Sequence, residues 1–125
     1  MRPITLNISE AAELRLYNIR DNVDSGIEFE MTDANGQPLP TDEYTVVFHF
    51  KTDKNNVNPD LEFTEANGDF IKSLGKILML FKKEKINGKA KTYSIDGIIT
   101  HKVYNISAPI AYGMAVIEKG ITQII

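Results

Sequence analysis

Hydrophobic and polar residues alternate along most of this chain, and a period of two residues is typical of half-buried β-strands. The clearest example is residues 27–31, where Ile, Phe and Met alternate with Glu. Residues 44–51 repeat the pattern with larger apolar side chains, and residues 4–8, 61–64 and 77–81 carry shorter versions. We expect each segment to be a strand with one face in the core.

The second half of the chain continues in the same style. Residues 91–95 and 98–106 are rich in Tyr, Ile, Val and Thr, which suit a pleated, half-buried surface. In residues 110–117, Ile, Tyr, Met and Val form one face, and Ala111, Gly113 and Ala115 lie on the other. Small residues on one face indicate that another backbone approaches closely.

Turn-forming residues separate these segments. Asp33–Gly36 ends in Asn-Gly, which tolerates the positive φ angles of a tight hairpin, and Asp96-Gly97 is a further predicted turn. Helix signals are weak: residues 9–13 and 70–74 are each expected to form a helical turn at most. Many short strands with such breaks predict an all-β sandwich or barrel.

Length and composition fit one globular domain. The chain has 125 residues, of which 42% are hydrophobic and 25% charged. There is no Cys, which excludes disulfides, thiolate metal sites and cysteine nucleophiles. The longest apolar run, residues 77–81, is far shorter than the roughly 20 residues of a membrane helix, and we expect no secretory signal at the start.

Residues with catalytic or metal-binding chemistry are few. His49 and His101 each lie in a predicted strand with no identifiable nucleophile or orienting acid beside them. Residues 33–37 resemble part of a calcium loop but lack its later Gly and Glu, so a turn explains them better. Glu28 and Glu30 share a strand face that we interpret as solvated. We therefore expect no enzyme, no cofactor and no metal.

Charge is divided unevenly along the chain. Residues 1–71 carry a net charge of −9 and residues 72–125 a net charge of +6, for a total of −3. Half of the basic residues fall in one window: Lys72, Lys76, Lys82, Lys83, Lys85, Lys89 and Lys91. Three interpretations stay open, in decreasing order of preference. The lysines keep a hairpin tip soluble, they contact an acidic protein surface, or they bind phosphate groups of nucleic acid.

Several segments together resemble a known family. Residues 27–39 combine a strand, a turn at Gly36 and the segment Gln37-Pro-Leu39. Residues 111–122 end in Gly120-Ile-Thr. Across residues 26 to 122 the chain resembles the immunoglobulin-like N-terminal domain of phage baseplate upper proteins and related phage fibre adaptors. The resemblance implies an immunoglobulin-like antiparallel β-sandwich over residues 26–125. Residues 1–25 would then be an N-terminal arm or edge strands.

The resemblance also implies a structural, oligomeric role without catalytic residues. We expect a virion protein that contacts other virion proteins and copies of itself, with no membrane and no nucleic acid as partners. The expected assembly contacts are the apolar ends and the lysine cluster: Ile4, Leu6, Ile8, Lys82, Lys83, Lys85, Ile121, Ile124 and Ile125. The alternative is a cell-surface carbohydrate- or protein-binding module. It would use a flat tyrosine platform from Tyr17, Tyr44, Tyr104 or Tyr112.

Overall fold

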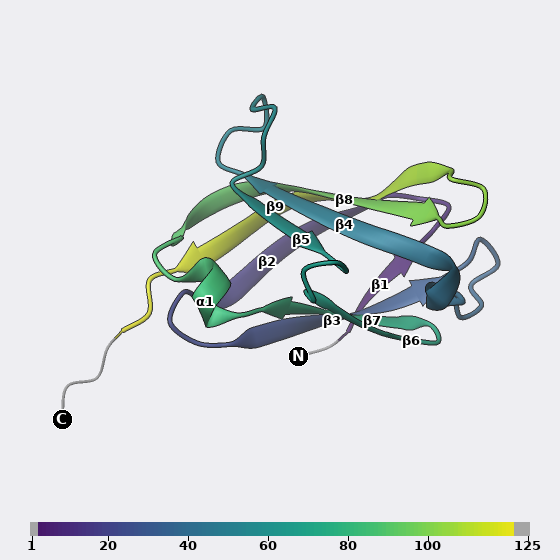
Figure 1. The fold of residues 1–125 in the computed structure, drawn as a ribbon, viewed down its shortest axis with the longest axis horizontal. Coiled ribbons are helices and arrows are strands. Elements are labelled where there is room, and N and C mark those ends of the chain that lie inside the picture. Colours follow the sequence, from purple (N-terminus) through teal and green to yellow (C-terminus); the bar gives the residue numbers. More distant parts are fainter. Residues whose placement is uncertain (1–2, 122–125) are drawn as a thin grey trace.

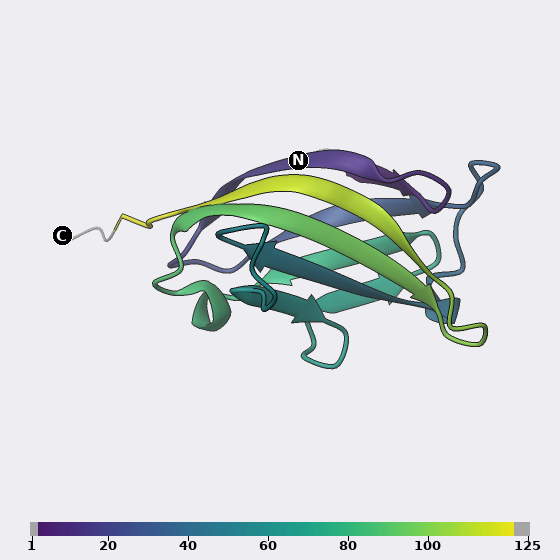
Figure 2. The same cartoon turned by 90° about the horizontal axis from the view of Figure 1, so that it is seen from above.

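The computed structural model describes residues 3–121, whose strands form two sheets packed face to face as a β-sandwich (Figures 1 and 2). One sheet has the order β1-β3-β7-β6, and the other has the order β2-β9-β8-β4-β5. The strands are β1 (Ile4–Asn7), β2 (Ala12–Arg20), β3 (Ser25–Thr32), β4 (Tyr44–Lys51), β5 (Leu61–Thr64), β6 (Phe70–Ser73), β7 (Lys76–Phe81), β8 (Lys91–His101) and β9 (Ser107–Glu118). Two short helical segments accompany them, η1 (Thr41–Glu43) and α1 (Lys83–Ile86).

The core lies between the two sheets and is built from their alternate residues. Phe29 of β3 stacks on Phe48 of β4, with ring centroids 5.6 Å apart, and so joins the two layers. Phe50 is fully buried and packs against Phe63 and Tyr93, with centroid distances of 4.8 and 5.8 Å. The predicted inward faces of residues 27–31 and 46–50 are therefore confirmed.

The two N-terminal strands correct the expectation of purely antiparallel sheets. β1 runs parallel to β3 and β2 runs parallel to β9, because the chain crosses from one sheet to the other after β1. The Asn7 side chain donates hydrogen bonds to Thr32 Oγ1 at 3.1 Å and to the Asp33 carbonyl at 2.7 Å, which fixes β1 on β3. Each strand is the edge of its sheet, and buried Leu6 and Leu14 belong to the same core as the rest of the chain.

A β-bulge in β9 determines which of its side chains face inward. Gly97 pairs with Ala111 and Ile98 with Pro109, so Ile110 is the extra residue, and Ile110 and Ala111 are both buried. Beyond the bulge the small residues face the core, and Tyr112, Met114 and Val116 face outward. The predicted close approach is confirmed at Gly113: a Cβ atom there would lie 2.0 Å from the Leu14 carbonyl oxygen.

Several local predictions from the sequence are wrong. Asp96-Gly97 lies inside β8, and residues 70–74 contain strand β6 instead of a helical turn. The lysine-rich segment after β7 is not a hairpin tip, since it contains α1 and crosses to β8 in the other sheet. Residues 33–36 do form a turn with Gly36 at φ 79°, but the chain then leaves for the other sheet instead of pairing β3 with β4.

Candidate assembly surface

The two histidines lie on neighbouring strands, His49 on β4 and His101 at the end of β8, each beside a glutamate. His49 Nε2 is 2.8 Å from Glu62 Oε2 on the neighbouring strand β5, and His101 Nε2 is 3.7 Å from Glu43 Oε1. These partners come from outside the predicted strands of the histidines, so the sequence did not reveal them. Among residues 3–121 the His49 side chain has no hydrogen-bond partner other than Glu62, and the pair lies on an open sheet face.

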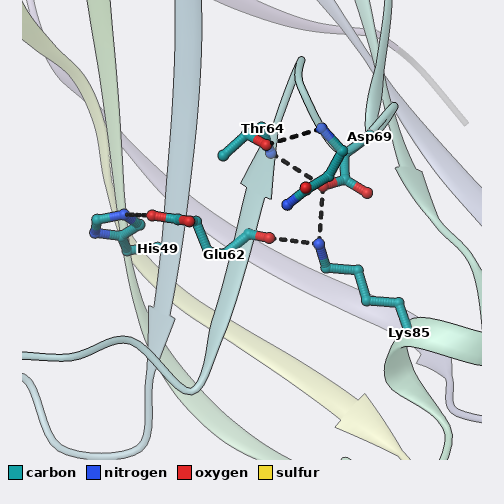
Figure 3. A network of polar contacts seen from close by, with 6 residues as sticks. His49, Glu62, Thr64, Asp69 and Lys85 are labelled. Atoms are coloured by element: carbon teal, nitrogen blue, oxygen red, sulfur yellow. Dashed lines mark hydrogen bonds and ion pairs between the residues drawn. The ribbon is translucent and has the colours of Figure 1, made fainter.

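Beyond this pair, a cluster of polar contacts joins β5 to α1 (Figure 3). We call this cluster, formed by Glu62, Thr64, Asp69 and Lys85, the polar clip. The ammonium group of Lys85 donates to the Glu62 carbonyl and to Asp69 Oδ2, the latter at 2.8 Å. The same Asp69 oxygen accepts the Thr64 backbone N–H at 3.0 Å. Asp69 is 2% exposed, and Lys85 Nζ also lies 4.6 Å from the centroid of the Phe63 ring. These contacts hold α1 against the sandwich.

Substitution of Asp69 by alanine tests the clip. We expect Asp69→Ala to lower the free energy of unfolding by about 2–3 kcal/mol, because the Thr64 N–H and the mostly buried Lys85 ammonium both lose an acceptor. Urea denaturation of the purified chain measures the change. Glu30→Ala, at an exposed position on β3, is the control and should stay within about 0.5 kcal/mol of the wild type. Equal effects from both substitutions would contradict a structural role for the clip.

Three of the seven lysines in the window pair with carboxylates of the same chain. Lys72 Nζ lies 2.5 Å from Glu65 Oε1 and donates to the Tyr44 carbonyl at 2.8 Å. Lys85 pairs with Asp69 at 2.8 Å, and Lys76 approaches Glu28 at 4.0 Å. The basic half of the sequence is thus partly neutralised by the acidic half of the same molecule. These contacts leave less of the window available for nucleic acid or an acidic neighbour.

Two carboxylates accept backbone hydrogen bonds in turns, and one of them, Asp33, belongs to the segment that resembled part of a calcium loop. Asp33 Oδ1 accepts the backbone N–H groups of Asn35 and Gln37, both at 2.9 Å. Asp60 Oδ2 accepts the Thr52 N–H at 2.7 Å, and this bond lowers the pKa of the Asp60 carboxyl. Within residues 3–121, no group of three or more His, Cys, Asp or Glu side chains is arranged to hold a metal ion.

Four exposed apolar side chains gather at one end of the sandwich. Residues 102–106 connect β8 to β9 there, and Val103, Tyr104 and Ile106 are 79%, 72% and 68% exposed. Leu74, 71% exposed, belongs to the turn between β6 and β7 at the same end (Figure 1). Helical segment η1 lies between these turns, because its Thr41 hydroxyl donates to the Ser73 carbonyl and its Glu43 carbonyl accepts the Lys102 N–H. We call Leu74, Val103, Tyr104 and Ile106 the apolar end.

An apolar groove of about 280 Å³ opens at this end. The His101 ring is its central feature, with the Tyr44 ring edge-on at 5.0 Å and the Tyr104 ring at 4.7 Å between centroids. The groove is lined by Ile8, Tyr44, Ile99, His101, Tyr104, Ile106 and Ala108. Such a hollow with an aromatic wall and an exposed apolar rim is suited to bind an apolar side chain of another molecule.

The structure does not bring the expected assembly contacts together on one surface. Ile8 lines the groove, Ile4 packs partly buried against the core, and Leu6 is fully buried, so Leu6 is not accessible to a neighbour. Ile121 is 77% exposed and follows β9, the strand that begins at the β8–β9 turn and runs toward the other end of the molecule (Figure 1).

The remaining expected contacts add little to the groove. Lys83 is exposed next to half-buried Lys82, while Lys85 belongs to the clip. Ile124 and Ile125 lie outside the described residues. The sequence did not single out Val103 or Ile106, because residues 98–106 looked like one continuous strand, nor Leu74, because residues 70–74 were expected to form a helical turn.

Comparisons with known proteins returned no relative: no protein-family model and no curated protein sequence matches this chain. Among residues 3–121, no helix has the length and apolar character needed to cross a membrane.

Proposed function

We propose that this chain is a structural protein of a bacteriophage particle, an adaptor or assembly domain of the baseplate, tail or head fibres. It acts through protein–protein contacts in the virion. The observation that carries the proposal is the apolar end with its groove. Burying one large apolar side chain contributes about 1.5–3 kcal/mol relative to leaving it in water, so these four residues favour a protein partner. A rigid sandwich presents them on two adjacent turns.

The proposal includes an immunoglobulin-like topology. That fold places strands A, B, E and D in one sheet and C, F and G in the other. The observed orders support this assignment when β3, β7 and β6 are taken as B, E and D, and β4, β8 and β9 as C, F and G. The parallel pairing of β1 with β3 is a departure from a purely antiparallel arrangement.

Purified particles provide the first test of this role. We expect the chain to be found in phage particles by mass spectrometry, and antibodies against it to label one position on the virion in electron micrographs. Detection in a host envelope fraction, with none in particles, would overturn the virion assignment.

Substitution at the apolar end tests the surface itself. The double change Tyr104→Ser and Ile106→Ser is expected to lower incorporation of the chain into particles at least tenfold, since loss of about 1.4 kcal/mol already weakens a contact tenfold. Incorporation is measured by quantitative immunoblotting of purified particles, and circular dichroism checks that the variant folds. Val57→Ser is the matched control, because Val57 is 91% exposed, does not line the groove, and belongs to the β4–β5 loop, which lies away from the β8–β9 turn (Figure 1). Equal incorporation of both variants would contradict the proposed contact.

A second candidate function is carbohydrate binding at the same groove. It is favoured by the exposed Tyr104 ring, which lies against His101 at an interplanar angle of 31° and extends an aromatic wall. Aromatic faces of this kind provide apolar contact with a polar tip at the edge. A glycan array separates the two candidates: binding that is lost in Tyr104→Ser supports the carbohydrate module, and no binding supports the assembly role.

A further inference from the structure

We propose that a second copy of this chain docks on the outer face of the five-stranded sheet. The surface is separate from the apolar end. The inference does not depend on which partner occupies the groove. It rests on the strand register, on the charges along two neighbouring rows and on the apolar residues between them.

The register aligns outward side chains into two rows across the strands. In the first row, Glu13 of β2 pairs with Tyr112 of β9, which pairs with Asp96 of β8, and His49 of β4 and Glu62 of β5 follow. The second row consists of Arg15, Met114, Ser94 and Lys51. The rows are two residues apart along each strand, roughly 7 Å.

The two rows carry opposite charge. The first row has the carboxylates of Glu13, Asp96 and Glu62 beside His49, and the second has the cations of Arg15 and Lys51. Inward side chains of the intervening row, including Leu14 and Phe50, belong to the core and do not reach this face. The outer face of the sheet therefore carries an acidic line next to a basic line.

A two-fold axis makes this face complementary to itself. The axis lies midway between the two copies. It runs perpendicular to the strands and passes between the two rows. Each acidic row then lies over the basic row of the other copy, with the strands of the two sheets antiparallel. Glu13 faces Arg15 of the second copy and Tyr112 faces Met114 of the second copy, and symmetry repeats both contacts. Aligned packing of two sheets is a common geometry.

The residues near the axis have the character of an interface centre. Tyr112 is 48% exposed, and Met114 and Val116 continue the apolar line along β9, with Tyr17 of β2, 45% exposed, at its end. Interface centres are enriched in Tyr and Met, and polar groups form the rim. A hollow of about 260 Å³ between Glu13, Arg15 and Met114, above Gly113, leaves room for side chains of the second copy.

The size of the face also suits a dimer. Five strands about 4.8 Å apart and about eight residues long cover roughly 24 by 26 Å. Such an area is comparable with the roughly 800 Å² that each partner contributes to a standard interface.

Charge reversal with rescue tests the proposal on the full chain. Sedimentation equilibrium at low ionic strength gives the dimer dissociation constant. We expect the wild type to dimerise in the micromolar range. Glu13→Arg alone opposes Arg15 of the second copy, and Arg15→Glu alone opposes Glu13, so each is expected to raise the dissociation constant at least tenfold. The double variant E13R/R15E exchanges the charges and is expected to return the constant to within about threefold of the wild type.

The matched control is Glu84→Arg, which changes the net charge as Glu13→Arg does but lies exposed on α1, away from the face. It should leave the dissociation constant within about threefold. Circular dichroism verifies that every variant is folded. A wild type that is monomeric at 100 µM overturns the proposal. A dissociation constant that is unchanged in both single variants also overturns it, as does a double variant whose dissociation constant is not restored. None of these results bears on incorporation into particles, which tests the apolar end.

Discussion

Replacing Gly113 with alanine is expected to destabilise the chain by about 3–5 kcal/mol, the first of the two largest effects we predict. A Cβ atom at this position would lie 2.0 Å from the carbonyl oxygen and 2.9 Å from the nitrogen of Leu14, both backbone atoms that cannot rotate away. The φ angle of Gly113 is +139°, which a side chain strains further. Overpacking and backbone strain each cost about 1–3 kcal/mol, so their sum gives the estimate.

Urea denaturation of Gly113→Ala measures this loss, and Gly36→Ala is the matched control. Gly36 also has a positive φ of +79°, but a Cβ atom there would have no neighbour within 4 Å. The control therefore contains the backbone strain without the collision and should cost only about 1–2 kcal/mol. Equal costs for the two variants would mean that β2 does not lie as close to β9 as the structure has it.

Replacing Phe50 with alanine is expected to remove a comparable 3–5 kcal/mol, because the cavity left by a buried aromatic ring is not refilled. Phe50 is completely buried and contacts three aromatic rings, those of Phe63, Phe81 and Tyr93. These rings come from both sheets and hold the layers together. The same urea titration measures the change.

A graded control sharpens this second prediction. Phe50→Leu keeps most of the apolar volume and is expected to cost clearly less than Phe50→Ala. Ile98→Ala, at a position 40% exposed on the outer face, should cost less than about 1 kcal/mol. Similar losses for Phe50→Ala and Ile98→Ala would contradict the central place of Phe50 in the core.

Local alternation was sufficient to predict strands and their buried faces where a strand is regular. Residues 27–31 and 46–50 follow a strict period of two, and their apolar members are buried. The pattern could not predict the bulge at Ile110, because an extra residue is defined only by the partner strand β8. It also could not predict which sheet each strand joins. It therefore missed the parallel pairing of β1 with β3 and of β2 with β9.

The candidate surfaces depend on tertiary geometry even more strongly. The lysine window looked free in the sequence, yet Lys72 and Lys85 find carboxylates supplied by other turns and strands. Conversely, Tyr104 and Ile106 looked like strand residues, and only the turn between β8 and β9 exposes them. Asn105, with its φ of +53°, is the one residue in that segment whose type hints at a turn.

The parallel pairing of β2 with β9 has a consequence for synthesis of the protein. Strand β2 leaves the ribosome long before β9, its only sheet neighbour among the described strands. Asp21, which follows β2, makes a second long-range contact: its carboxylate accepts the Gly120 N–H, 99 positions later in the chain. Strand β2 must therefore wait, without its sheet partner, until β9 has been synthesised. Such long-range closure makes folding slow.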